Sequence, residues 1–300
     1  MPSYAEIRRQ ELKHIEQSLK DDRKMKRELA KIYSSSLEDI QRHIDADIMR
    51  FAAKENVSMA EAKRIISKTD VEAFQSTAKR YVEEKDFSPT ANKQLRRFNV
   101  TMRTSRLELL QARINLDTVM LAWEEEQLTA KYITEEVIKE HIRQAGILGM
   151  TVPSRSQLET LARSVLLSDV SGATFSDRIW ANQNELRNNI NQTIERALIR
   201  GEHPRNAAAS IKRLVRDEYG MKKRAADRIL VTEVARGQSI AAIESFKEAD
   251  IDKYIWISEP SACDVCAELN DKVFTLGAAN NIMPPETHPF CRCAISAYVE

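Results

Sequence analysis

All four cysteines of this 300-residue chain lie within its last forty residues, and one of its five histidines lies among them. Their order is Cys263-x-x-Cys266, a longer spacer, and then His288-Pro-Phe-Cys291-Arg-Cys293. Thiolate sulfur and imidazole nitrogen, paired at short spacing on two sides of a loop, are the ligands of a tetrahedral zinc site. The clustering therefore predicts a small C-terminal unit whose fold depends on a metal.

A structural zinc site takes four ligands, and this sequence offers five candidates. Cys263 and Cys266 form the first pair, and Cys291 with either His288 or Cys293 forms the second. The spacing leaves open which of these last two is spare. The alternatives are two disulfides, which need an oxidising compartment, and four idle thiols. The chain starts without an apolar signal segment, so we expect synthesis in a cytosol and favour structural Zn²⁺.

Signatures of common enzyme classes are absent from the sequence. Zinc deaminases carry H-x-E ahead of P-C-x-x-C, but no H-x-E precedes Cys263. The chain also lacks H-E-x-x-H, a P-loop, G-x-G-x-x-G and G-x-S-x-G. A lone helical carboxylate such as Glu233 is usually a surface or ion-pair residue. We expect no catalytic residues and no enzyme; a zinc-dependent hydrolase or nuclease is the least favoured alternative.

Long helices are predicted for the first half of the chain. Glycine (7) and proline (8) are scarce and charged residues make up 30 % of the chain, a composition typical of helical proteins. Ser58 and Glu61 have the spacing of a capping box, and Pro89 marks a break. We expect helices over about 3–51, from about 59, and over about 90–131. Their lengths predict an elongated helical N-terminal part, residues 1–145, that acts as an interaction region.

A helical middle domain is predicted for residues 150–250, after a boundary marked by Gly146, Gly149 and Pro153. Ser156 and Glu159 have the spacing of a capping box. The expected helices follow Gly172 and stop at Gly201, run from Pro204 to Gly220, and run from about Lys222 to Glu248.

A small β unit is predicted for residues 251–300. The expected strands, rich in β-branched and aromatic residues, are 254–257, 272–275 and 294–299. Such a loop-rich unit buries little apolar surface, and a metal would supply the missing stability. The predicted fold class is therefore mainly α, with an elongated helical N-terminal part, a helical middle domain and a small C-terminal β unit pinned by zinc.

Positive charge is concentrated in one segment of a chain whose net charge is only +1. Residues 187–236 hold twelve basic and six acidic residues, with Lys222, Lys223 and Arg224 in succession. Solvated helix faces are the favoured interpretation, and binding of double-stranded DNA is the alternative. No run of eighteen apolar residues occurs, so we expect no contact with a membrane.

Three further side chains receive structural interpretations. Arg292, between two thiols, could contact a phosphate or a carboxylate, and we favour an ion pair that braces the loop. Trp180 and Trp256 are expected in the core rather than as platforms for stacking bases. The four other histidines are scattered singly and suggest no site.

Several motifs together resemble the C-terminal signature of the phage Mu F-like head morphogenesis family, the minor capsid proteins of tailed phages. They are Val231-Thr232-Glu233, Trp256, Cys263-x-x-Cys266, Val273-Phe274 and Pro284-Pro285-x-x-His288-Pro289-x-Cys291-Arg292-Cys293. Upstream, Phe175-Ser176-Asp177-Arg178-Ile179-Trp180 and Gly201-x-x-Pro204 are similar to members of the same family. The resemblance covers roughly residues 171–297, and the first half of the chain resembles these proteins more loosely.

The resemblance implies a virion component that is made together with the portal and scaffold proteins. Such a protein enters the procapsid in few copies by contacting the portal, and assists genome packaging or the later ejection of DNA. The implied partners are the portal protein, the scaffold or major capsid protein, and double-stranded DNA. We expect several copies on the portal, in the capsid interior, after assembly in the host cytoplasm.

Overall fold

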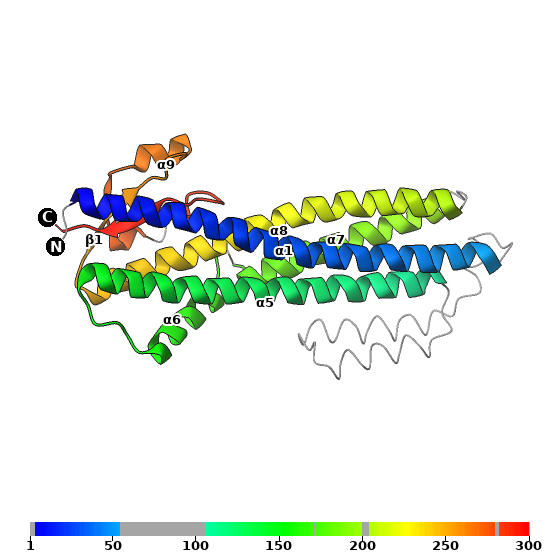
Figure 1. Cartoon of the computed structure of the whole chain (residues 1–300), viewed down its shortest axis with the longest axis horizontal. Coiled ribbons are helices and arrows are strands. Elements are labelled where there is room, and N and C mark those ends of the chain that lie inside the picture. Colours follow the sequence, from blue (N-terminus) through cyan, green and yellow to red (C-terminus); the bar gives the residue numbers. More distant parts are fainter. Residues whose placement is uncertain (1–3, 55–105, 171, 200–203, 280–281, 300) are drawn as a thin grey trace. The chain divides into compact units, whose positions relative to one another are not determined.

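A computed structural model describes residues 4–54, 106–170, 172–199, 204–279 and 282–299 (Figure 1). The chain forms two compact units, each assembled from segments far apart in the sequence. Unit 1 takes Met1–Leu29, Glu126–Arg178 and Ala226–Glu300, and unit 2 takes Ala30–Glu125 and Ile179–Ala225. The division into residues 1–145, 150–250 and 251–300 stays a prediction from sequence.

The described residues are mainly helical, and a small strand unit lies at the C-terminal end, as predicted. The long helices are α1 (Tyr4–Lys54), α5 (Arg106–Leu148), α6 (Arg155–Leu167), α7 (Phe175–Ile199) and α8 (Pro204–Glu248). None of these described helices is long and apolar enough to cross a membrane.

Of the first two helices predicted for the N-terminal part, one is confirmed and one lies outside the described residues. Helix α1 confirms the helix expected over about 3–51. The helix expected from about 59, its capping box at Ser58 and Glu61, and the break at Pro89 lie outside the described residues.

Helix α5 shows that the predicted helix end near Lys131 is wrong, because the helix continues to Leu148. Tyr132, Ile133 and Val137 lie beyond Lys131 and are all buried. These side chains extend the inward face of the helix by two turns, and their packing stabilises the continuation.

The cap of α6 corrects a second prediction. Ser154, not Ser156, is the N-cap, and its backbone N–H donates to the Gln157 side chain at 2.9 Å. The Ser154 hydroxyl in turn accepts the Gln157 N–H, which completes a capping box. Ser156 lies inside the first turn, so the predicted Ser156–Glu159 box does not form. Two overlapping pairs with the same spacing made the choice ambiguous in sequence.

Helix α7 begins at Phe175, as expected after Gly172, and Thr174 precedes its first turn. The Thr174 N–H donates to the Asp177 carboxylate at 2.9 Å, and the Asp177 N–H donates to the Thr174 hydroxyl at 3.2 Å. This exchange satisfies two N–H groups that the first helical turn leaves without partners. The expected stop at Gly201 lies outside the described residues.

Helix α8 is continuous where two helices were predicted. It begins at Pro204, as expected, and passes through Gly220 without a break. A helical glycine costs about 1 kcal/mol relative to alanine. Tyr219 and Ala226 on either side are buried, and this packing outweighs the intrinsic preference of one glycine.

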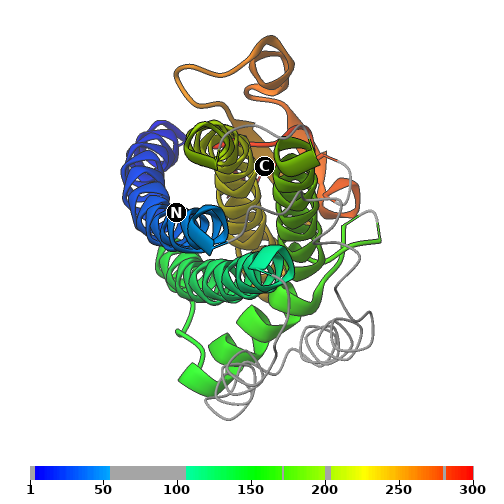
Figure 2. The same ribbon diagram turned by 90° about the vertical axis from the view of Figure 1, so that its right-hand side faces the viewer.

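Unit 2 has an apolar core made by segments of four helices. Figure 2 looks along these segments of α1, α5, α7 and α8, which surround a common interior. The fully buried side chains include Ile40, Ile44, Ile114, Leu186, Ile190, Ile194, Ile211 and Val215. Trp180 is 9 % exposed, which confirms its predicted place in a core.

Unit 1 contains a three-stranded antiparallel sheet of β1 (Lys253–Ile257), β2 (Val273–Thr275) and β3 (Ala294–Ala297), in the order β2-β1-β3. Tyr254 pairs with Phe274, and Trp256 pairs with Ile295. All three predicted strands are present. Two short elements between β1 and β3 were missed: the helix α9 (Asp264–Leu269) and the 3-10 turn η1 (Leu276–Ala278).

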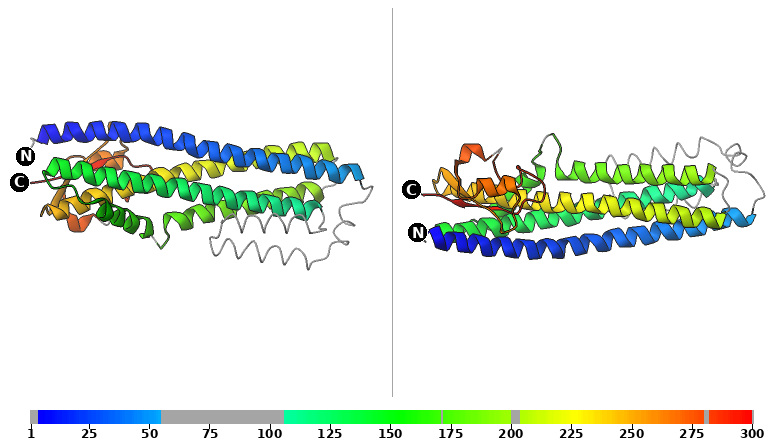
Figure 3. Two further views of the ribbon diagram at one scale, coloured as in Figure 1. Left: turned by 60° about the horizontal axis from the view of Figure 1, so that its bottom comes forward. Right: turned by 90° about the horizontal axis from the view of Figure 1, so that it is seen from above.

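The sheet packs on the last turns of α8 and, within unit 1, lies near the beginning of α1 (Figure 3). Phe246, Tyr254, Trp256 and Ile295 form the centre of this core. Trp256 is fully buried, as predicted. Cys266, Cys291 and Cys293 belong to the same cluster, so one edge of the core consists of thiols.

Candidate metal centre

The first two candidate ligands are held by the short helix α9. Cys263 is its N-cap residue, and the Ala267 N–H donates to the Cys263 carbonyl at 2.8 Å. This single helical turn brings the side chains of Cys263 and Cys266 to the same side. Cys263 is exposed, whereas Cys266 is buried against the core.

The other candidates lie on the loop that enters β3. Phe290 has a positive φ of 64°, which turns the chain sharply between His288 and Cys291. The Phe290 N–H donates to the Thr232 hydroxyl of α8 at 3.2 Å, and this bond ties the turn to the helix. The side chains of Cys291 and Cys293 are buried.

The five predicted residues meet in two overlapping groups that share Cys266. One group is Cys263, Cys266 and His288; the other is Cys266, Cys291 and Cys293, with all ligand atoms of a group within 4.8 Å of one another. The His288 Nε2 lies 3.3 Å from the Cys263 sulfur and 3.0 Å from the Cys266 sulfur. The sulfurs of Cys266 and Cys291 are 3.6 Å apart, and all four cysteines are free thiols.

These separations suit a tetrahedral metal ion. With Zn–S near 2.3 Å and Zn–N near 2.0–2.1 Å, a tetrahedron has edges of about 3.8 Å between sulfurs and about 3.6 Å between sulfur and nitrogen. The observed sulfur–sulfur distance of 3.6 Å is close to its edge, and the sulfur–nitrogen distances of 3.3 Å and 3.0 Å are shorter than theirs. A metal-ligating histidine usually donates its other N–H to a carbonyl, and His288 Nδ1 lies 2.8 Å from the Pro289 carbonyl oxygen. That bond leaves Nε2 with a free lone pair.

The thiols lie in environments that act on their pKa values in different ways. Burial raises the pKa of Cys266 to about 12. The hydrogen bond from the Cys291 thiol lowers the pKa of Cys293 to about 6, and the same contact raises the pKa of Cys291. Deprotonating such buried thiols together requires a compensating positive charge, and a coordinated cation supplies it.

Arg292 forms an ion pair, as predicted, and its partner lies on a helix far away in the sequence. Its Nε donates to the Asp22 carboxylate of α1 at 2.7 Å, Nη2 donates to the second oxygen of that carboxylate, and Nη1 donates to Gln238 at 2.7 Å. Arg292 and Asp22 are 5 % and 4 % exposed. Asp22 was not predicted from the sequence. The available signal was a charged residue at an inward-facing position of the helix periodicity.

A second charged group joins two of the motif segments. Glu233 accepts from Arg236 Nε at 2.8 Å and from Arg178 of α7. The interpretation of Glu233 as an ion-pair residue is confirmed, but the residue is buried rather than on the surface. Arg236 also donates to Ser168 at 2.8 Å. The Phe175–Trp180 and Val231–Glu233 motifs are therefore in contact, and Thr232 joins them to the cysteine loop through Phe290.

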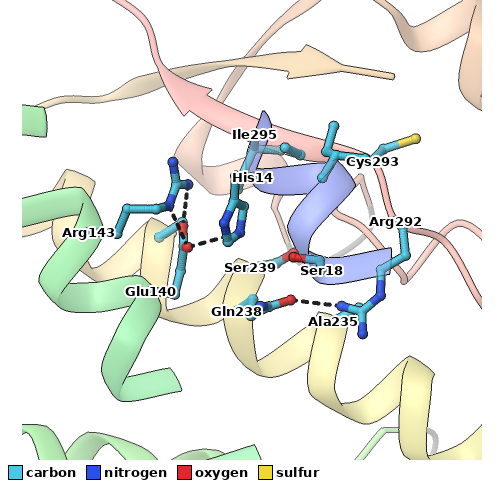
Figure 4. A pocket seen from close by; sticks show the side chains of 13 residues that line it. His14, Ser18, Glu140, Arg143, Ala235, Gln238, Ser239, Arg292, Cys293 and Ile295 are labelled. Carbon is cyan, nitrogen blue, oxygen red and sulfur yellow. Dashed lines mark hydrogen bonds and ion pairs between the residues drawn. The ribbon is translucent and has the colours of Figure 1, made fainter. Parts of the chain in front are cut away.

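A cavity of about 30 Å³ lies beside the cysteine loop and between α1, α5 and α8. Figure 4 shows His14, Glu140 and Arg143 on one side of it and Arg292 with Gln238 on the other. The Cys293 sulfur points away from this cavity. The cavity has room for only one or two water molecules, which is too small for a substrate.

One arrangement in unit 1 combines a serine, a histidine and a carboxylate. Ser245 lies 3.1 Å from His141 Nδ1, and His141 Nε2 lies 3.2 Å from Glu248. Ser245 is fully buried and donates its own proton to the Ala241 carbonyl at 3.0 Å. No substrate can reach a fully buried serine, so we assign this group to packing between α5 and α8.

The basic segment is partly neutralised within unit 2. Lys212 pairs with Asp45 at 2.8 Å, and Lys222 pairs with Glu185 at 2.6 Å. Arg213, Arg216 and Arg224 of α8 are exposed.

Residues 188–296 match the family model described as Phage Mu protein F like protein. The matched segment contains the Val231–Glu233 motif and all five candidate ligands. The resemblance to the phage Mu F-like family is thereby confirmed over this part of the chain. No curated protein and no solved structure matches the chain.

Proposed function

We propose that this chain is a minor capsid protein of a tailed phage, a head morphogenesis protein that enters the procapsid in few copies through the portal. The observation that carries the proposal is the family match over residues 188–296. The contacts among Thr232, Phe290 and the cysteine loop support it, because they join separate motifs of the matched segment into one structure.

The proposed role is structural, in head assembly and in DNA packaging or ejection, and its partners are the portal protein and the scaffold or major capsid protein. The long helices would supply the contact surface. The C-terminal strand unit would hold the first part of α1 in place, since Arg292 of this unit binds Asp22 of α1.

Quantitative mass spectrometry of purified procapsids and mature virions of the parent phage tests this role. We expect the chain at one fixed, low ratio to the portal protein in both particles. Absence from both particles would overturn the proposal. A phage lacking the chain provides the control, and should produce fewer or non-infectious heads.

We also propose that Cys263, Cys266, His288 and Cys291 bind one structural Zn²⁺, and that Cys293 is the spare candidate. Three of its six ligand–ligand distances, 3.0–3.6 Å, and the hydrogen-bonded His288 ring support this set, while Cys293 also lies within 4.8 Å of Cys266 and Cys291. Four protein ligands leave no open position for a water nucleophile, so the set argues against a zinc-dependent hydrolase or nuclease.

Metal analysis of the purified full-length chain tests the ligand set. We expect about one zinc ion per chain for the wild type and for Cys293→Ser. Cys263→Ser, Cys266→Ser, His288→Ala and Cys291→Ser should each lose most of it. A wild-type protein without zinc contradicts the metal site, and loss of zinc in Cys293→Ser alone would exchange the roles of His288 and Cys293.

Binding of double-stranded DNA is a second candidate function, favoured by the exposed arginines Arg213, Arg216 and Arg224 on α8. Phosphate contacts make binding strongly salt-dependent. Replacing all three arginines with glutamine should reduce the slope of log affinity against log salt by about 3. Lys212→Gln is the matched control, because Lys212 already pairs with Asp45. A wild-type affinity that does not change with salt rules this candidate out.

A further inference from the structure

The cysteine loop and the first helix are joined by a buried ion pair across 270 residues of sequence. Arg292 holds the Asp22 carboxylate through two nitrogens and also donates to Gln238 at 2.7 Å. Gln238 in turn donates to Glu136 of α5 at 2.9 Å. One arginine therefore connects α1, α8 and, through a glutamine, α5. Figure 4 shows the contact between Arg292 and Gln238.

Two further contacts join the same part of α1 to the C-terminal unit. Asp271, which precedes β2, accepts hydrogen bonds from Tyr4 and Arg8. Lys26 lies over the Phe290 ring, 5.2 Å from its centre. Contacts with the segment that carries the cysteines are thus spread along the whole of residues 4–29.

The central contact depends on the position of the loop. A buried ion pair stabilises a fold only when its geometry is good, because both charges have lost their water. Arg292 has Cys291 and Cys293 as its neighbours, and both of their side chains are buried in the cysteine cluster. The loop conformation that places these two sulfurs therefore also sets the position from which the Arg292 side chain reaches Asp22. A loop without its ligand-holding conformation would leave Asp22 buried without a partner.

We propose that the metal site is a latch for the N-terminal helix: binding of the ion and docking of α1 residues 4–29 stabilise each other. The inference rests on the zinc site proposed above and adds a regulatory consequence to it. Loss of the ion would release Arg292, Phe290 and Asp271 together, and these three residues contact this part of α1. Coupling of this kind is reciprocal, so undocking the helix must also weaken binding of the ion.

Hydrogen exchange of the full-length chain, with and without a zinc chelator, tests the first direction. We expect amides of residues 8–26 to exchange at least about 10-fold faster after chelation, together with those of residues 258–293. Faster exchange confined to residues 258–293, in a protein that held zinc beforehand, overturns the latch and leaves the metal site intact. A protein without zinc overturns the metal site itself, so the two failures are distinguishable.

Zinc affinity of Asp22→Asn tests the reverse direction, with the zinc ion alone as the probe in competition with a chelating dye. We expect binding about 10-fold to 100-fold weaker than in the wild type, as for other residues that support metal ligands. Asp21→Asn is the matched control, since Asp21 is the neighbouring carboxylate and bonds to Gln17 instead. Equal affinities for the two variants overturn the proposal.

A second substitution separates the latch from simple misfolding. Arg292→Lys keeps the charge but cannot hold both carboxylate oxygens in one plane. We expect the Arg292→Lys protein to keep the helical circular dichroism spectrum of the wild type. It should nevertheless bind zinc more weakly and exchange the amides of residues 8–26 faster. A folded Arg292→Lys protein with wild-type values for both measurements also contradicts the latch.

Discussion

The first helix buries two different kinds of face along its length. In unit 2 its inward residues are Ile40 and Ile44, together with Tyr33, whose hydroxyl donates to the buried Glu125 at 2.9 Å. In unit 1 the inward positions follow one another at alternating spacings of four and three, and half of them are polar: Glu11, Ile15, Ser18, Asp22, Met25 and Leu29. Both stretches are regular helix, so they differ only in the contacts that their buried side chains need from the neighbouring elements.

An apolar face needs volume, whereas a buried charge needs one particular partner. Ile40 and Ile44 are satisfied by any well-packed apolar surface. Glu11 needs Arg143, which donates to both of its oxygens at 2.9 Å, and Asp22 needs Arg292. Polar residues on such a seam fix the register of a helix at some expense of stability. The stretch of α1 that holds Glu11 and Asp22 is therefore expected to be specific and sensitive to its partners, and the stretch that holds Ile40 and Ile44 to be tolerant.

The largest difference should come from the metal. Cys266→Ser removes the ligand shared by both cysteine groups. Structural zinc supplies on the order of 10 kcal/mol of apparent binding free energy to small metal domains, so we expect the strand unit to unfold. Zinc content and hydrogen exchange measure this: residues 251–299 should lose protection while the unit 2 helices keep theirs. Full protection of residues 251–299 in zinc-free Cys266→Ser would contradict the comparison.

Unit 2 should respond to a loss of apolar volume and not to zinc. Ile190→Ala truncates a fully buried side chain of α7 and is expected to cost about 2–5 kcal/mol of unfolding free energy. Chemical denaturation with and without chelator measures the loss, which should be the same in both conditions. Leu214→Ala is the control, since Leu214 of α8 also lies in unit 2, is 41 % exposed and should change stability little when truncated. A loss that appears only without zinc would show that the two units are not separable in this way.

The two kinds of face also differ in how far the sequence predicts them. Apolar periodicity gave α1, strand composition gave β1, and cysteine spacing brought five ligand candidates to one place. These patterns are local. The partner of Arg292 is not, because Asp22 lies 270 residues away and a charged residue on a helix is normally expected to face solvent.

The errors in the helix boundaries have a related cause. Gly220 was interpreted as an end of a helix because local preference is all that a sequence window contains. Packing of Tyr219 and Ala226 decides the continuation of α8, and that packing is known only once the neighbours are placed. The serine that caps α6 was misplaced by two residues for a local reason, since Ser154 and Ser156 both have a suitable residue three positions later.

The buried charges of unit 1 should make its stability depend on pH. Burial raises the pKa of Glu11 to about 7 from an ordinary 4.5, with Glu140 nearby and Arg143 shared between them. Because the folded pKa is the higher one, the contribution of Glu11 is fully present below pH 4.5 and is lost as the pH rises through about 7. Glu11→Gln removes this dependence, so from pH 5 to pH 8 the variant should gain about 1–3 kcal/mol relative to the wild type.

Denaturation at several pH values measures that difference, and it isolates Glu11 from its neighbour. Burial lowers the pKa of His14 to about 4, so its contribution has the opposite sign and is lost as the pH falls below 6.5. His14 is present in both proteins and cancels to first order. Glu16→Gln is the control, because Glu16 is exposed and pairs with Lys20 on the same helix. A difference between wild type and Glu11→Gln that stays constant with pH would show that Glu11 remains charged.

The smallest predicted effects come from two glycines of α8, one in each unit. A Cβ at Gly237 would lie 2.9 Å from a Val137 methyl group and 3.5 Å from a Val165 methyl group, whereas a Cβ at Gly220 would meet nothing within 4 Å. Both substitutions gain about 0.5–1 kcal/mol from the helix preference of alanine. At Gly237 crowding costs about 1–3 kcal/mol, so Gly237→Ala should destabilise the protein and Gly220→Ala should stabilise it. Opposite shifts in the denaturation midpoint would show that close approach of α5 and α6 to α8, rather than chain flexibility, requires the glycine in unit 1. Shifts of the same sign would mean that unit 1 accommodates added volume as readily as unit 2.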